Sequence, residues 1–154
     1  MEYKVIVNAF ENGTEGIATF LETEEIKDIM ITIEDYQSKF KGNSLTDEPQ
    51  LKEALNILTG IHSEVTIIAA IAEAYAETNE ARALLIAKNT PVDDGKGGQK
   101  APTDEVAKAM SKDKNLPYLR TANLFTAYSK VCGQKIMTIQ SMMNYLKKPI
   151  PPQG

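Results

Sequence analysis

Apolar residues recur at alternating spacings of four and three between residues 117 and 148. Such a spacing keeps one narrow stripe on a single side of a helix for several heptads, and the stripe needs a partner surface. The pattern predicts a helix over residues 117–148, with Pro117 in its first turn, where a missing N–H costs little, and Pro149 at its end. Gly133 is its weak point. The stripe consists of Tyr118, Ala122, Phe125, Ser129, Cys132, Ile136, Ile139, Met143 and Leu146.

Residues 51–89 follow the same alternation and predict the partner helix, roughly 58 Å long if unbroken. His62 and Asn79 lie in its seam. Gly60 costs about 1 kcal/mol against Ala in a helix interior, so we expect a kink or break there. The seam consists of Leu51, Leu55, Leu58, Val65, Ala69, Ala72, Ala76, Ala83 and Ile86, and a second apolar row of Ile57, Ile61, Ile68, Ile71 and Tyr75.

The two stretches predict a long antiparallel helical hairpin joined by residues 90–101. This linker contains Pro and three Gly, which indicates an exposed, flexible connector. Pro102 to Glu105 then begin a short separate helix that runs to about Lys112. The hairpin leaves the second apolar row uncovered, so either the N-terminal helix or another copy of the chain must cover it. Self-association is the simpler solution, and we expect a homo-oligomer.

Residues 1–50 predict a smaller mixed element. Residues 3–10 are rich in β-branched and aromatic side chains and are followed by the turn signal Asn12–Gly13. They predict a strand, with residues 17–21 as the returning strand of a β-hairpin. Residues 24–41 predict a helix that Thr23 caps and Gly42 ends, and Asp47 or Thr46 then caps the next helix.

The expected fold is therefore mainly α, in a single domain over residues 1–154. Residues 1–50 form the N-terminal β/α element, residues 51–148 the helical hairpin, and residues 149–154 a disordered tail. The tail contains Pro149-x-x-Pro152, which we interpret as a helix stop and loose end rather than as a ligand for an aromatic groove.

Charge is distributed unevenly along the chain. Residues 1–81 contain 16 acidic and 5 basic residues, a net charge of −11, whereas residues 82–154 contain 5 acidic and 12 basic residues, a net charge of +7. This polarity favours an anionic partner for one end or, equally, pairing between the two halves. The single cysteine, Cys132, excludes an internal disulfide and suits a reducing compartment. No signal peptide is visible, so we expect a cytoplasmic protein.

No catalytic motif is present, and we expect neither an enzyme nor a metal or cofactor site. His62 has Thr59 where a ferritin-like site needs Glu, so a structural histidine is favoured. We interpret Cys132 as an inert core thiol, and Glu73, Glu77 and Glu80 as a solvated acidic face. The segment from Gly95 to Lys100 lacks the order of a phosphate-binding loop, although its backbone N–H groups and lysines suit phosphate contacts. A simple linker is slightly favoured over a binding loop.

An antiparallel hairpin brings Arg82, Lys88 and Arg120 to one end, from which the linker also hangs. Cations at that end can bind phosphates whatever the base sequence. Tyr118 offers a surface on which a base could stack, although its seam position favours packing in the core. In a ring of subunits such weak contacts add by avidity. The candidate nucleic-acid-binding residues, here called the basic tip, are Arg82, Lys88, Lys96, Lys100, Lys108, Lys112, Lys114 and Arg120.

Residues 65–146 contain, in order, Ala81–Arg82 near the end of a long helix, the Gly-rich loop, residues 110–114 (MSKDK) and a terminal helix with Phe125, Cys132, Ile139–Gln140 and Met143. In this order of features the chain resembles the UvsY-type phage recombination mediators. The resemblance implies a helical ring that binds single-stranded DNA and helps load a RecA-like recombinase while the single-strand-binding protein is displaced. Arg82 matches the DNA-binding arginine of that family's Lys-Ala-Arg run, but Glu80 replaces the lysine.

The leading hypothesis is a non-enzymatic, oligomeric helical protein that binds single-stranded DNA and assists phage-type recombination or replication, in the bacterial host cytoplasm if phage-encoded. The alternative is a protein-interaction module, or a phage inhibitor of a host protein, that acts through the acidic N-terminal half. A purely structural assembly is a third option. The subunit number, the choice between DNA and RNA, and the role of residues 1–50 stay open.

Overall fold

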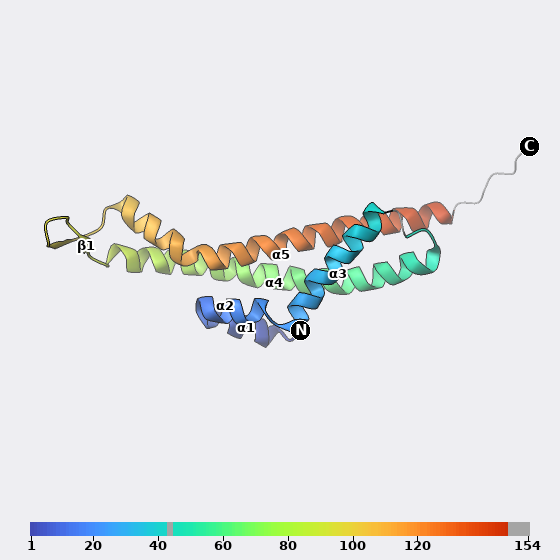
Figure 1. The fold of residues 1–154 in the computed structure, drawn as a ribbon, viewed down its shortest axis with the longest axis horizontal. Helices are drawn as coiled ribbons and strands as arrows, with labels where there is room; N and C mark the ends of the chain where they lie inside the picture. Colours follow the sequence, from blue (N-terminus) through green and yellow to red (C-terminus); the bar gives the residue numbers. More distant parts are fainter. Residues whose placement is uncertain (43–44, 148–154) are drawn as a thin grey trace, which may run out of the picture.

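The computed structural model describes residues 1–42 and 45–147. Within them the chain forms five helices and two short strands, and Figure 1 shows an elongated molecule in which two long helices lie side by side. The predicted mainly α fold and the long antiparallel hairpin are confirmed, whereas self-association stays a prediction. The elements are α1 (Tyr3–Glu11), α2 (Gly13–Leu21), α3 (Glu24–Lys41), α4 (Glu48–Lys88), β1 (Val92–Asp93), β2 (Gln99–Lys100) and α5 (Asp104–Leu146).

The register of α4 against α5 is antiparallel throughout. Asn79 contacts Asn115 through a hydrogen bond of 3.2 Å. Further along the pair, Thr126 donates to Glu73 over 2.9 Å, and Thr66 and Ser129 share a hydrogen bond of 2.8 Å. The two apolar stripes predicted from the sequence therefore face one another, with Val65, Ala72, Phe125 and Cys132 among the buried positions.

The break expected at Gly60 is wrong, because α4 is continuous over 41 residues. Leu58 and Val65, on either side of the glycine, are both buried in the seam, and this packing outweighs the propensity cost of about 1 kcal/mol. Asp47 caps the helix by accepting a hydrogen bond from the Gln50 N–H over 2.8 Å, as predicted. By length and composition α4 also resembles a membrane-spanning helix, but its apolar rows pack here on α5 and on the N-terminal helices.

The short helix expected before Pro117 is also wrong, since α5 runs unbroken from Asp104 with Pro117 inside it. The seam continues N-terminally through Ala107, Ser111 and Asn115, which are buried but small or polar. Pro117 has no N–H to donate to the carbonyl of Asp113, and such prolines bend helices. In Figure 1, α5 changes direction between its yellow and orange parts.

The predicted N-terminal β-hairpin is replaced by the two helices α1 and α2. Their buried residues Ile6, Phe10, Ile17 and Phe20 are spaced at helical intervals, and burial of this face overrides the β propensity of the residues. The predicted turn at Asn12–Gly13 exists, with Gly13 at φ +71°, but it joins two helices.

Close approach of α1 and α2 depends on a second glycine. A Cβ atom added to Gly16 would collide with the backbone carbonyl oxygen of Ala9. The predicted α3 is confirmed with its bounds, although Thr23 donates its hydroxyl to the Phe20 carbonyl instead of capping with its side chain.

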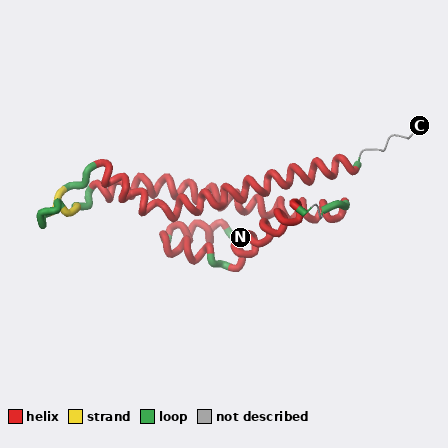
Figure 2. The backbone as a smooth tube through the Cα atoms, turned by 45° about the horizontal axis from the view of Figure 1, so that its top comes forward, coloured by secondary structure: helices red, strands yellow, loops and turns green. Residues whose placement is uncertain are grey.

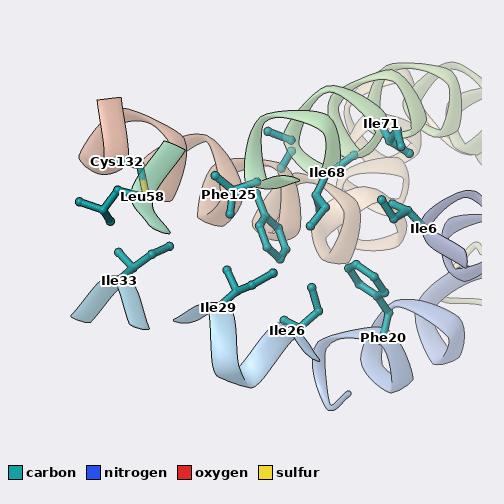
Figure 3. Close-up of a cluster of buried hydrophobic side chains, with 14 of the residues drawn as sticks. Ile6, Phe20, Ile26, Ile29, Ile33, Leu58, Ile68, Ile71, Phe125 and Cys132 are labelled. Carbon is teal, nitrogen blue, oxygen red and sulfur yellow. The ribbon is translucent and has the colours of Figure 1, made fainter. Parts of the chain in front are cut away.

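The helices α1–α3 cover most of the second apolar row of α4, although Ile57 stays 37 % exposed. Figure 3 shows Ile6, Phe20 and Ile26 beside Ile68, with Phe125 of α5 in the same cluster. The chain thus covers with its own N-terminal layer most of the row that we expected a second copy to cover. This layer ends short of the linker end of the hairpin (Figures 1 and 2). The start of α2, with Gly13 and Thr14, nevertheless reaches Arg82 and Lys114.

The linker carries more structure than a flexible connector. Val92 pairs with Lys100 and Asp93 with Gln99 in an antiparallel two-stranded sheet. The expected end of the helix at Pro149 and the tail over residues 149–154 lie outside the described residues.

Candidate nucleic-acid interface

All eight residues of the basic tip are exposed and lie toward the same end of the hairpin. The pairing of Asn79 with Asn115 sets their relative positions. Arg82 lies three residues beyond that pair toward the tip, and Arg120 lies five residues to its other side. At 1.5 Å per residue the two arginines are separated by about 12 Å along the hairpin axis. Arg120 therefore forms the inner edge of the tip.

Most of these cations have no acidic partner among the described residues. Within those ranges, Lys88 is the one tip residue in an ion pair, at 3.1 Å from Asp104. Residues 82–120 contain eight basic and five acidic residues, a net charge of +3. The remaining cations are solvated and available to phosphates.

The eight cations share an end but do not share a face. On α5, Lys108 and Lys112 are one turn apart and lie on one side, whereas Lys114 is rotated by about 200° from Lys112. On α4, Arg82 and Lys88 are rotated apart by about 120° in the same way. The tip thus presents cations on two sides, and Lys114 and Arg82 belong to the same one, because both line one hollow.

This hollow, of about 520 Å³, lies between α2, α4 and α5. Thr14 contributes from the first turn of α2, Asn79, Arg82 and Ile86 from α4, and Lys114 and Pro117 from α5. A smaller hollow of about 240 Å³ lies beside it and shares Asn79, Arg82 and Tyr118. Sequence reasoning missed this site, because its walls depend on a proline inside α5 and on α2 lying against the hairpin.

Tyr118 packs in the core and offers no stacking face. Its side chain is 9 % exposed, and its ring centroid lies 6.3 Å from that of Phe10. The interpretation of Tyr118 as a packing residue is therefore confirmed, although Tyr118 also contributes to the walls of both hollows.

In the Gly-rich loop, several backbone N–H groups are already hydrogen-bonded within the loop. Asp94 accepts hydrogen bonds from the N–H groups of Lys96, over 2.7 Å, and Gly98, over 2.9 Å, and Asp93 accepts one from Gly95. The N–H groups of Lys96 and Gly98 hold the pKa of the Asp94 carboxyl below its ordinary value. The loop's own carboxylates thus engage the N–H groups of Gly95, Lys96 and Gly98, and contact between this loop and phosphates stays a prediction. Its lysine side chains stay exposed.

The histidine, the cysteine and the glutamate face considered from the sequence lie in or beside the packing between α4 and α5. His62 is half-buried, and a Cβ on Gly133 would lie 3.5 Å from its Nε2. Cys132 is fully buried, which raises the pKa of its thiol to about 11. Glu73 accepts the hydroxyl hydrogen of Thr126 and so joins α4 to α5. Across residues 1–42 and 45–147, no three His, Cys, Asp or Glu side chains gather where they could hold a metal ion.

Comparison with protein-family models, curated proteins and solved structures found no match for this chain.

Proposed function

We propose that this protein is a non-enzymatic binder of single-stranded nucleic acid that acts through its basic tip. The observation that carries the proposal is the concentration of exposed cations toward one narrow end of the hairpin, nearly all without an ion pair among the described residues. The release of condensed counterions from the phosphates that these cations neutralise supplies the free energy of such binding, without regard to base sequence.

The distribution of the cations favours a single strand over a duplex. Lys112 and Lys114 point to different sides of α5, and a ligand that neutralises both must pass around the tip. A duplex is stiff over about 150 base pairs and contacts one side only, whereas a single strand follows the bend.

The proposal includes a role in phage-type recombination or replication as a recombinase mediator, for which the support is the resemblance to the UvsY-type proteins. Assembly into a homo-oligomer belongs to the same proposal. The tip carries the exposed large apolar side chains Leu85, Leu116 and Leu119, which supply contact area for a second copy. A recombinase or a single-strand-binding protein is the partner that this role implies.

A second candidate function is binding of a basic protein by the N-terminal layer. Every acidic residue of α1–α3 is exposed. Lys27 and Lys39 neutralise only part of this charge, through ion pairs with Glu22, Glu24 and Asp35. Such a surface steers a cationic partner.

The proposal is tested by fluorescence anisotropy with a labelled oligothymidylate of about 20 nucleotides and with a duplex of equal length. We expect the single strand to bind more tightly, with log K falling against log salt concentration by about 0.7 for each phosphate neutralised. The triple variant R82E/K112E/K114E should lose binding. K41E is the matched control, since Lys41 is exposed at the far end of α3.

Absence of single-strand binding at about 50 mM salt, where such contacts are strongest, would overturn the proposed function. Binding of a cationic protein that survives the tip substitutions and is lost on charge reversal at Glu24 and Asp28 would instead establish the second candidate.

A further inference from the structure

We propose that the hollow between α2, α4 and α5 holds one unpaired nucleotide of the bound strand, with the phosphate between Arg82 and Lys114 and the base against Ile86 and Pro117. This inference rests on the proposed function and names the unit of the strand that one side of the tip recognises. The hollow thereby has a role distinct from that of the other cations, which contact phosphates at any position along the strand.

Two cations from different helices meet at this hollow. Arg82 comes from α4 and Lys114 from α5, and neither forms an ion pair with any residue that the structure describes. The guanidinium donates two parallel N–H groups to a phosphate, and the ammonium adds a mobile point charge. The first turn of α2 forms part of the same wall, with Thr14 in it, and its N-cap residue Asn12 makes no side-chain capping bond. Glu15 in the same first turn offsets the positive end of that helix, so the attraction for the phosphate depends on Arg82 and Lys114.

The opposite part of the hollow suits a base. Ile86 is 44 % exposed although it is a large aliphatic residue beside the core, and Pro117 adds an apolar ring. Asn79 supplies a side-chain amide, and Asp113, an exposed carboxylate that also lines the hollow, supplies acceptors for the base edge and leaves the hollow with two cations and one anion. These groups match the apolar face and polar edge of a base.

The size of the hollow fits a single nucleotide. Its volume of about 520 Å³ lies within the range of about 300–1,000 Å³ that small-molecule sites occupy. A base in a duplex is stacked and paired on its edge, so it enters only at the cost of unstacking. The hollow therefore adds a preference for single strands that charge alone does not supply.

The test compares K114A with K112A, which remove the same charge two residues apart on different sides of α5. We expect K114A to weaken binding of the oligothymidylate about tenfold, because a charge-assisted contact is lost, and K112A to weaken it only about twofold. A 2-aminopurine base within the strand should change its fluorescence on binding to wild type and to K112A, but much less with K114A or R82A.

A second comparison isolates the base without altering charge. Wild type should bind the oligothymidylate about fivefold more tightly than an oligomer of equal length without bases. I86A should lose this preference while its salt dependence stays unchanged. Ile86 is half-exposed, so the variant should fold, and circular dichroism checks this.

Equal effects of K112A and K114A, or a base preference that survives in I86A, would overturn the nucleotide site while leaving the proposed function intact. Complete absence of single-strand binding by wild type would remove both.

Discussion

The side-chain amide of Asn79 donates a hydrogen bond to Asn115 Oδ1 over 3.2 Å, within the seam that joins α4 to α5. Asn115 is 1 % exposed, and its own Nδ2 is buried without a hydrogen-bond partner among the described residues. A buried donor left in this state costs about 1–3 kcal/mol. A single polar pair in an apolar seam also fixes the register of two helices, because any slip separates the partners.

We therefore predict that Asn115→Leu raises the free energy of unfolding by about 1 kcal/mol. The substitution removes the unsatisfied amide, and Asn79 is only half-buried, so water replaces its lost partner. Urea unfolding measures the change, and hydrogen exchange along α5 should slow in step with it. A clear loss of stability would mean that Asn115 contributes more as a polar partner than its free amide costs.

We predict that replacing glycine by alanine changes the free energy of unfolding in opposite directions at two positions. Gly60 lies in α4, where an added methyl group would meet nothing within 4 Å, so Gly60→Ala should stabilise by about 1 kcal/mol through helix propensity. Gly16 lies in α2, where the added Cβ would collide with the backbone oxygen of Ala9. Gly16→Ala should destabilise by about 1–3 kcal/mol, because α1 and α2 must move apart.

The urea midpoints of the two variants measure this contrast. Each variant is the control for the other, since both substitutions add one methyl group to a helix. Equal and positive changes would show that α1 and α2 do not depend on their close approach at Gly16.

The long hairpin was predictable because its stripes extend over many heptads. Seam positions such as Leu58, Phe125 and Ile139 are large and apolar, and their spacing alone sets the helix type and face. The N-terminal third of α5 was not predictable in this way. Its seam residues Ala107 and Ser111 carry no apolar signal, so the pattern indicates a helix start at Pro117 although this proline lies inside the helix.

The N-terminal layer illustrates a conflict between local propensity and packing. Helices as short as α1 and α2 are unstable alone, and β-branched residues such as Val5 and Ile6 favour strands. Phe10 stacks on Tyr75 at a centroid distance of 5.6 Å, and Phe20 lies 6.3 Å from Phe125. These long-range contacts stabilise the helices and are absent from any local pattern.

At the candidate site, too, some features follow from the sequence and others depend on tertiary packing. Charge and topology sufficed to place Arg82 and Arg120 toward one end. The hollow required knowledge of how α2 packs on the hairpin, for which residues 1–50 give no sequence signal.

We predict that replacing Pro117 of α5 stabilises the protein and weakens its binding of the single strand. Pro117→Ala restores an N–H to the carbonyl of Asp113, and an interior proline costs about 3 kcal/mol in a helix. Greater freedom of the unfolded chain offsets about 0.4–1 kcal/mol of this gain. We expect a higher urea midpoint together with weaker binding of the oligothymidylate, because α5 straightens and the hollow loses its apolar wall.

Gly133→Ala is the matched control for this prediction. It also improves helix propensity in α5, and its Cβ makes an ordinary contact of 3.5 Å with His62. It should raise stability without weakening binding. Weaker binding by both variants would attribute the loss to stiffening of α5 as a whole and not to the hollow.

We predict that ionisation of Cys132 destabilises the folded protein at alkaline pH. The thiol is fully buried, and burial raises its pKa from 9.0 to about 11, since the thiolate is poorly solvated in the core. Below pH 9 both folded and unfolded chains hold the proton, and the contribution of the thiol to stability is complete. Between pH 9 and about 11 the unfolded chain loses the proton first, so the free energy of unfolding falls.

The alkaline contribution of Cys132 must be separated from that of the tyrosines, because burial also raises the pKa of Tyr36, Tyr75 and Tyr128. Cys132→Ala achieves this separation, since the tyrosines remain in both proteins. Urea unfolding should show a stability difference between wild type and Cys132→Ala that is constant below pH 9 and narrows above it. In wild type at neutral pH, a thiol reagent should react only as fast as the seam opens, and reaction at the rate of an exposed thiol would place Cys132 outside the core.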